Sequence, residues 1–212
     1  MDDLKESLTR YLDELHDALL WKLDGLGEYD LRRPLTPTGT NLLGLVKHVA
    51  AVEAEYFGLV FDRPFPDPPA WLVAQEQPDN VDMWATAEES TASILDFFAR
   101  VRAHGRQTIA ALDLDTAGFV SWWGPGGRDV TLGRVLVHVL AEVARHAGHA
   151  DIVRELIDSA AGLADGNDNL PDRDATWWGE YYERVQRAAE EAAGRPTSAP
   201  GSEIARRSGH DT

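Results

Sequence analysis

The stretch "HVLAEVARHAGHADIVRE", from His138 to Glu155, reads as an uninterrupted helix and holds three of the seven histidines of the chain. At about 100° per residue, Glu142, His146 and His149 fall within about 80° of His138 around the helix axis. Hydrophobic residues share this side of the helix: Val135, Val139, Val153 and Leu156. The four polar side chains should therefore point into the protein. A buried carboxylate without a partner costs on the order of several kcal/mol, so Glu142 needs a cation or hydrogen-bond donors.

A metal ion is one such cation. Glu142 and His146 lie four residues apart, so they can bind one ion from successive turns of the helix. A third ligand is available in "LLGLVKHVAAVEAEYF", where His48 is spaced to point inward together with apolar neighbours. Two histidines and one carboxylate, with an open position, are typical of catalytic zinc, and they also suit Fe(II), Ni(II) or Mn(II). The alternative is that His48 is a core histidine bonded to a carbonyl group.

Three more residues of the same helix are candidates for contacts around a ligand. His138 and His149 could orient Glu142 or a bound molecule. Arg154 could contact a carboxylate of a cofactor, or it could pair with Glu155 or Asp158 on the surface. The remaining histidines are expected outside the site: His16 and His104 on helix surfaces, and His210 in the tail.

Hydrophobic periodicity predicts four long helices and a shorter fifth one. The expected ranges are 4 to about 25–27, 41–61, 86–112, 131–158 and 172–193. Thr40, Thr131 and a capping box of Thr86 with Glu89 are the expected N-terminal caps. Four long helices indicate an all-α helix bundle, with its site between facing helices.

The connections between these helices differ in character. Residues 62–80 are rich in proline and predict a long crossover without a regular helix. The glycine-rich stretch "DTAGFVSWWGPGGRDV" predicts a loop with a small hairpin around "GPGG". Four tryptophans of the connections could cover a pocket or pack the loops onto the ends of the bundle: Trp71, Trp84, Trp122 and Trp123. Residues 1–192 are expected to form one helical domain, and residues 193–212 a disordered tail.

Composition limits the partners. Thirty-six acidic residues face 20 basic ones, which gives a net charge of −16 and argues against binding to nucleic acid or anionic lipid. No run of 18 apolar residues is present to span a membrane, and the acidic N-terminus argues against a signal peptide. With no cysteine, the chain has neither a disulfide nor a thiol nucleophile of its own. We expect a cytoplasmic globular protein.

Two motifs together resemble the DinB-like superfamily: "NLLGLVKHVAAVEAEYF" and, about a hundred residues later, "LVHVLAEVARHAGHADIVRELID". The likeness is closest to an actinobacterial branch of mycothiol-dependent metalloenzymes, and "ATWWGEYYERV" is similar to that branch as well. It covers residues 1–192. The resemblance implies an up-down-down-up four-helix bundle and one divalent metal held by His48, Glu142 and His146. Many members have two histidines on the last helix; the glutamate here is similar to that of mycothiol-dependent maleylpyruvate isomerase.

The resemblance also implies a function. A divalent ion, zinc by expectation, would activate a low-molecular-weight thiol such as mycothiol for S-transfer or isomerisation of a small electrophile, because coordination lowers the pKa of a thiol. Hydrolysis by metal-bound water and oxygen chemistry on iron are variants. The alternative from another class is a non-catalytic protein that binds metal or small molecules, or acts in stress responses. Family analogy further predicts a homodimer.

Overall fold

The computed structural model describes residues 3–194. The chain divides into two compact units, Met1–Asn169 and Leu170–Thr212. The first unit is mostly helical, as predicted, but it also contains a two-stranded sheet. The description of the fold as all-α is therefore corrected by this small hairpin.

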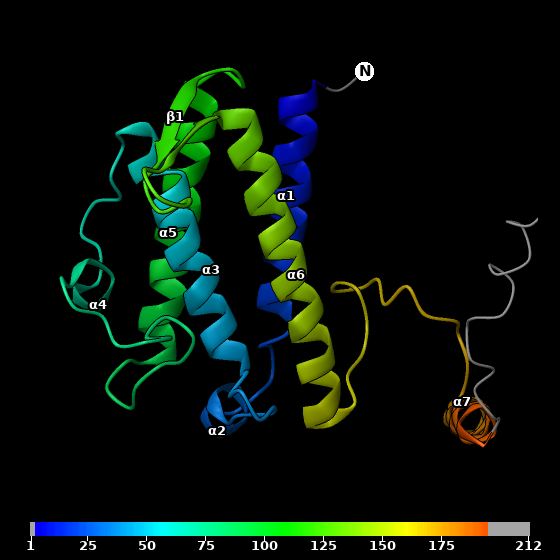
Figure 1. Ribbon diagram of the computed structural model, residues 1–212. Coiled ribbons are helices and arrows are strands. Elements are labelled where there is room, and N and C mark those ends of the chain that lie inside the picture. The colour runs from blue at the N-terminus through cyan, green and yellow to red at the C-terminus, as the bar shows by residue number, and fades with distance from the viewer. Residues whose placement is uncertain (1–2, 195–212) are drawn as a thin grey trace, which may run out of the picture. The chain divides into compact units, whose positions relative to one another are not determined.

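Four long helices make up the first unit: α1 (Leu4–Trp21), α3 (Leu42–Tyr56), α5 (Thr91–Ala111) and α6 (Leu132–Asp158). α3 packs against both α5 and α6, and α1 packs against α6. α1 and α6 run in one direction and α3 and α5 in the other, because a long crossover links α3 to α5 (Figure 1). Twelve of the fifteen residues of α3 are buried, so this helix forms the centre of the core. Its sequence is accordingly apolar on nearly every side, as expected for a helix without a solvated face.

Two of the predicted caps are wrong. α3 begins after Asn41 rather than Thr40, because the Asn41 side chain accepts a hydrogen bond from the backbone N–H of Gly44 at 2.8 Å. α5 begins after Ser90 rather than Thr86. Glu89 does accept from the backbone N–H of Thr86, at 2.8 Å, as in a capping box, but its carboxylate also binds a buried lysine, and the helix starts later. The Thr131 cap of α6 is confirmed.

The last residues of two helices also differ from those predicted from hydrophobic periodicity. α1 ends at Trp21, and the chain then turns through Gly25, whose φ of +77° favours glycine. α3 ends at Tyr56 and is followed by a 3-10 turn, η1 (Leu59–Phe61). Two short helices were not predicted, α2 (Glu28–Arg32) and, within the crossover, α4 (Ala70–Val73). Four- and five-residue helices leave too little periodicity to recognise.

The predicted hairpin is confirmed. β1 (Ala117–Val120) pairs with β2 (Arg128–Thr131) in antiparallel register, and Val120 lies opposite Arg128. Val120 and Val130 are buried, so one face of the hairpin is anchored on the bundle.

The second unit contains α7 (Ala175–Ala193), which matches the predicted fifth helix but, with 19 residues, is longer than α3. The Asp174 side chain caps it by accepting from the backbone N–H of Trp177. None of its residues is buried. The predicted disordered tail falls almost entirely on residues 195–212, which lie outside the described residues.

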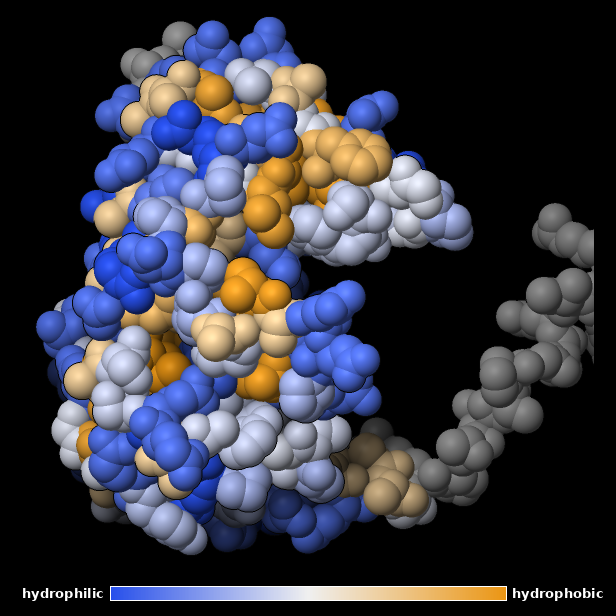
Figure 2. Space-filling model, turned by 90° about the vertical axis from the view of Figure 1, so that its left-hand side faces the viewer, coloured by the Kyte–Doolittle hydropathy of each residue, from blue (hydrophilic) through white to orange (hydrophobic). Residues whose placement is uncertain are grey.

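The described helices include none that is both long and apolar enough to cross a membrane. Figure 2, which shows the crossover side of the molecule, displays small hydrophobic areas between hydrophilic ones.

Candidate metal centre

His48, Glu142 and His146 come together where α3 packs against α6. One possible ligand atom from each residue lies within 4.8 Å of the other two. The Glu142 Oε1 atom is 3.1 Å from His146 Nε2 and 3.5 Å from His48 Nε2. The two imidazole rings meet edge to face, with centroids 4.6 Å apart. The structure therefore places the three residues predicted from helical spacing and from the apolar neighbours of His48 side by side.

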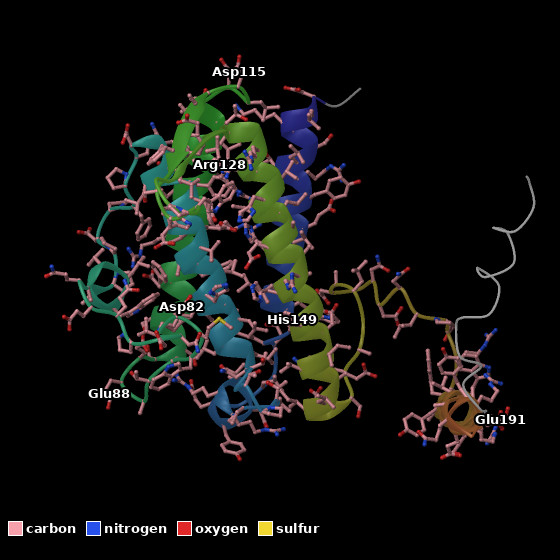
Figure 3. The ribbon with its side chains drawn as sticks, viewed as in Figure 1. Asp82, Glu88, Asp115, Arg128, His149 and Glu191 are labelled. Carbon is pink, nitrogen blue, oxygen red and sulfur yellow. The ribbon has the colours of Figure 1, made fainter. Side chains whose placement is uncertain are left out.

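Asp82, in the crossover, holds the other side of His48. Its Oδ2 atom is 2.6 Å from His48 Nδ1. Since an ionised carboxylate only accepts hydrogen bonds, Nδ1 carries the hydrogen. Nε2 faces Glu142: in the protonated ring it donates to this carboxylate, and in the neutral ring it is the nitrogen free to bind a cation. In known metal sites, a histidine ligand almost always donates its other ring N–H to a carboxylate, a backbone carbonyl or water. Asp82 and His149 lie at a similar level of the bundle, beside α3 and on α6 respectively (Figure 3).

Sequence reasoning missed Asp82. It lies in an irregular, proline-rich connection that has no periodicity, 34 residues from its partner. No local pattern distinguishes it from the other acidic residues of the crossover. Only the folded path of the chain brings it to His48.

The hydrogen bonds and charges of these four residues shift one another's pKa values. Hydrogen bonding from His48 lowers the pKa of Asp82. Burial alone would lower the pKa of His48, but the hydrogen bonds to Asp82 and Glu142 outweigh it and the pKa is raised. Burial and the nearby charge of His48 lower the pKa of His146. Burial alone would raise the pKa of Glu142, but the hydrogen bonds from His146 and His48 outweigh burial, and the pKa is lowered.

These side chains fit a divalent cation. Two imidazole Nε2 atoms point at one carboxylate oxygen, so either protons or a cation must lie between them. The Glu142 side chain is 31% exposed, so a small ligand from solvent can reach the cluster. Two nitrogens and one oxygen with an accessible side are the donor set of a catalytic zinc site.

The other predicted residues of α6 lie around this cluster or away from it. His149 is exposed, with its ring 5.3 Å from that of His146. His138 packs against Tyr56 and Trp123, with ring centroids 4.9 Å away in both cases. Leu156, expected to face inward, is 59% exposed, because the buried side of α6 is centred on Val139, Val143, Ala150 and Val153, about 100° round the helix axis from Leu156.

Arg154 is used elsewhere. Its guanidinium group binds Asp158 at 2.8 and 3.0 Å and donates to the backbone carbonyls of Lys22 and Asp24. The side chain therefore ties the end of α6 to the turn after α1. All of these contacts lie outside the histidine cluster.

Trp71, Trp122 and Trp123 pack their connections onto the bundle, whereas the side chain of Trp84 is largely exposed. Trp122 and Trp123 both donate to the Tyr56 hydroxyl, at 3.3 and 2.7 Å. Trp71 packs against Phe97 and lies 4.3 Å from the ammonium group of Lys47. Trp84 is 51% exposed, and its backbone carbonyl accepts from Lys47.

The surface position predicted for His16 is wrong. Its side chain is 2% exposed and pairs with the equally buried Glu53 of α3. Leu12 and Leu19, one turn away on either side, are buried as well, so His16 belongs to the inner face of α1. His104 is half-buried and bonds the carbonyl of Arg63 at 2.7 Å.

The fold and this cluster define a helical protein with a candidate site for a divalent metal. The family model for mycothiol-S-transferase matches residues 7–159, which is most of the chain. The chain therefore belongs to the mycothiol-S-transferase family, and the resemblance seen in its motifs is confirmed.

The fold has a counterpart among solved structures. The crystal structure of a conserved protein from Enterococcus faecalis is similar with a TM-score of 0.56 and 15% sequence identity. The match covers 76% of this chain and all of that one, and it concerns the fold alone. No curated protein matches this chain.

Proposed function

We propose that the protein is a metal-dependent mycothiol S-transferase. In this proposal His48, Glu142 and His146 hold one divalent ion, zinc, and mycothiol supplies the sulfur that attacks a small electrophile. The observation that carries the proposal is the convergence of three ligand atoms within 4.8 Å, in a chain of the mycothiol-S-transferase family.

A bound divalent cation would lower the pKa of a coordinated thiol well below about 8.5, so that the thiolate forms at neutral pH. The residues of the chain do the rest. Glu142 contributes a negative charge that offsets the cation, and Asp82 fixes the orientation of His48. The chain has no cysteine, so the sulfur must come from a second molecule. Isomerisation would use the same residues: the thiol would add to the electrophile and be released again after the electrophile has changed its configuration.

The test is thiol consumption by chelator-stripped protein given zinc, mycothiol and a chlorinated nitrobenzene. We expect the rate to rise with zinc until about one ion per chain is bound. His48→Ala should abolish both zinc binding and turnover. The matched control is His104→Ala, which removes a histidine that bonds the Arg63 carbonyl and lies outside the cluster.

Two other outcomes would contradict the proposal in different ways. Zinc binding without thiol consumption would indicate a non-catalytic metal-binding protein. Wild-type protein that binds no zinc, iron, nickel or manganese would refute the metal site itself.

A further inference from the structure

Lys47 is a fully buried lysine next to His48 in the chain. Its ammonium group donates to the carbonyls of Val81 and Trp84 at 2.9 and 3.0 Å. It also pairs with Glu89 at 2.9 Å. The two carbonyls flank Asp82, so two consecutive residues of α3 hold the same loop. The Lys47 side chain bonds the backbone of the loop, and the His48 ring bonds the side chain of Asp82.

The start of α3 adds two more contacts with this loop. The Asn41 side chain donates to the carbonyl of Met83 at 3.2 Å. Gly44 lets the loop approach closely, because a Cβ atom there would lie 1.9 Å from the Met83 oxygen. Residues 41, 44, 47 and 48 therefore hold the four-residue segment Val81–Trp84, which we call the 81–84 segment, against α3.

Burying an ammonium group costs more free energy than burying an apolar side chain of similar size. Its desolvation is offset only when it has several well-placed partners, and an apolar side chain of similar size often stabilises a core as well or better. The 81–84 segment itself is only partly buried and has no regular secondary structure. A single bond from Asp82 to His48 would have to overcome the entropy of ordering such a loop, about 1–2 kcal/mol per residue. Lys47 makes the bonds that order the backbone on both sides of Asp82.

We propose that Lys47 is a positioning residue of the metal centre. By fixing the 81–84 segment it holds the Asp82 carboxylate against His48 Nδ1, which sets the tautomer of His48 and directs Nε2 towards Glu142. The role concerns the geometry of one ligand rather than contact with substrate. This inference rests on the proposed function, in which His48 binds the metal.

The test compares Lys47→Met with Lys22→Met. Lys22 is the matched control: it is equally buried, and it bonds the carbonyl of Gly162, pairs with Asp151 at 2.8 Å and lies over the Trp21 ring. Both variants should lose stability, because each removes a buried ammonium group from its partners. Two measurements separate them: zinc affinity by chelator competition, and the ring tautomer of His48 by ¹⁵N NMR of metal-free protein.

Lys47→Met should weaken zinc binding by about 10- to 100-fold, the usual cost of losing the partner of a ligand. It should also remove the dominant Nδ1–H form of His48. Lys22→Met should change neither. If Lys47→Met does not fold, Gly44→Ala displaces the same segment with Lys47 in place and should have the same two effects.

A folded Lys47→Met or Gly44→Ala protein with wild-type zinc affinity and the wild-type His48 tautomer would overturn the inference. Failure of the proposed function looks different. Wild-type protein would then bind no metal, while the NMR measurement on metal-free protein would still report whether Lys47 sets the His48 tautomer.

Discussion

His48 lies at the centre of the candidate site, because its two ring nitrogens face two carboxylates, those of Asp82 and Glu142. Glu142 was recognisable from its spacing to His146 on one helix, and His48 from the apolar residues around it. Asp82 was not recognisable, since it lies in an irregular loop. Helical periodicity can identify residues that share a face, but it says nothing about a partner that only the path of a crossover supplies.

Asp82→Asn should weaken zinc binding by about 10- to 100-fold, because an amide is a weaker acceptor for the His48 Nδ1–H and no longer fixes its tautomer. Chelator competition measures this. Asp79→Asn, an exposed position three residues earlier in the same crossover, is the control and should bind zinc as the wild type does. Equal affinities for the two variants would show that Asp82 has no part in the site.

Among the elements, the helices were predicted well and their ends less so. Long apolar stripes determine the presence of α1, α3, α5 and α6, whereas their first and last residues depend on local side-chain bonds. Asn41 and Ser90 make the caps that Thr40 and Thr86 were expected to make. Glu89 illustrates the reason: it bonds the Thr86 N–H as predicted, yet its second partner is Lys47, far away in sequence.

The end of α6 gives a prediction about pH. Hydrogen bonding from Arg154, above all, lowers the pKa of Asp158 below its ordinary value of 3.8. A lowered pKa means that the pair stabilises the fold above that value, and that the contribution disappears as the pH falls through the lowered pKa. Asp158→Asn should therefore lower the melting temperature at pH 7 and have a smaller effect below pH 3.8.

Thermal unfolding followed by circular dichroism measures this difference. Glu155→Gln is the control, since this neighbouring acidic residue is exposed and is not the partner of Arg154. A melting temperature of Asp158→Asn equal to that of the wild type at pH 7 would contradict the role given to this pair.

At the scale of the whole molecule, the site belongs to one unit. His48, Asp82, Glu142 and His146 all lie within Met1–Asn169, which has its own core, and the family model matches residues 7–159. A chain ending at Asn169 should therefore fold and bind zinc with the affinity of the full chain. Chelator competition and circular dichroism of both chains check this, and loss of zinc affinity in a folded short chain would contradict it.

The oligomeric state is a second prediction at this scale. Family analogy predicts a homodimer, so light scattering should give about twice the chain mass of 23.4 kDa. A mass equal to that of one chain at micromolar concentration would refute the dimer. Neither periodicity nor composition bears on this prediction, because both describe how one chain buries its own residues.

The most direct measurement of the central claim is a zinc titration of chelator-stripped Glu142→Gln protein, with thiol consumption followed at each point. Glutamine keeps the shape of the side chain but removes the charge that offsets the cation. We expect zinc affinity to fall by at least about tenfold, though less than in His146→Ala, since an amide oxygen coordinates weakly. At saturating zinc the rate should also drop. Without the carboxylate the metal centre carries more positive charge, which lowers the pKa of the bound thiol, and a thiolate of lower pKa is a weaker nucleophile. Wild-type affinity together with wild-type turnover would remove Glu142 from the site and contradict the account.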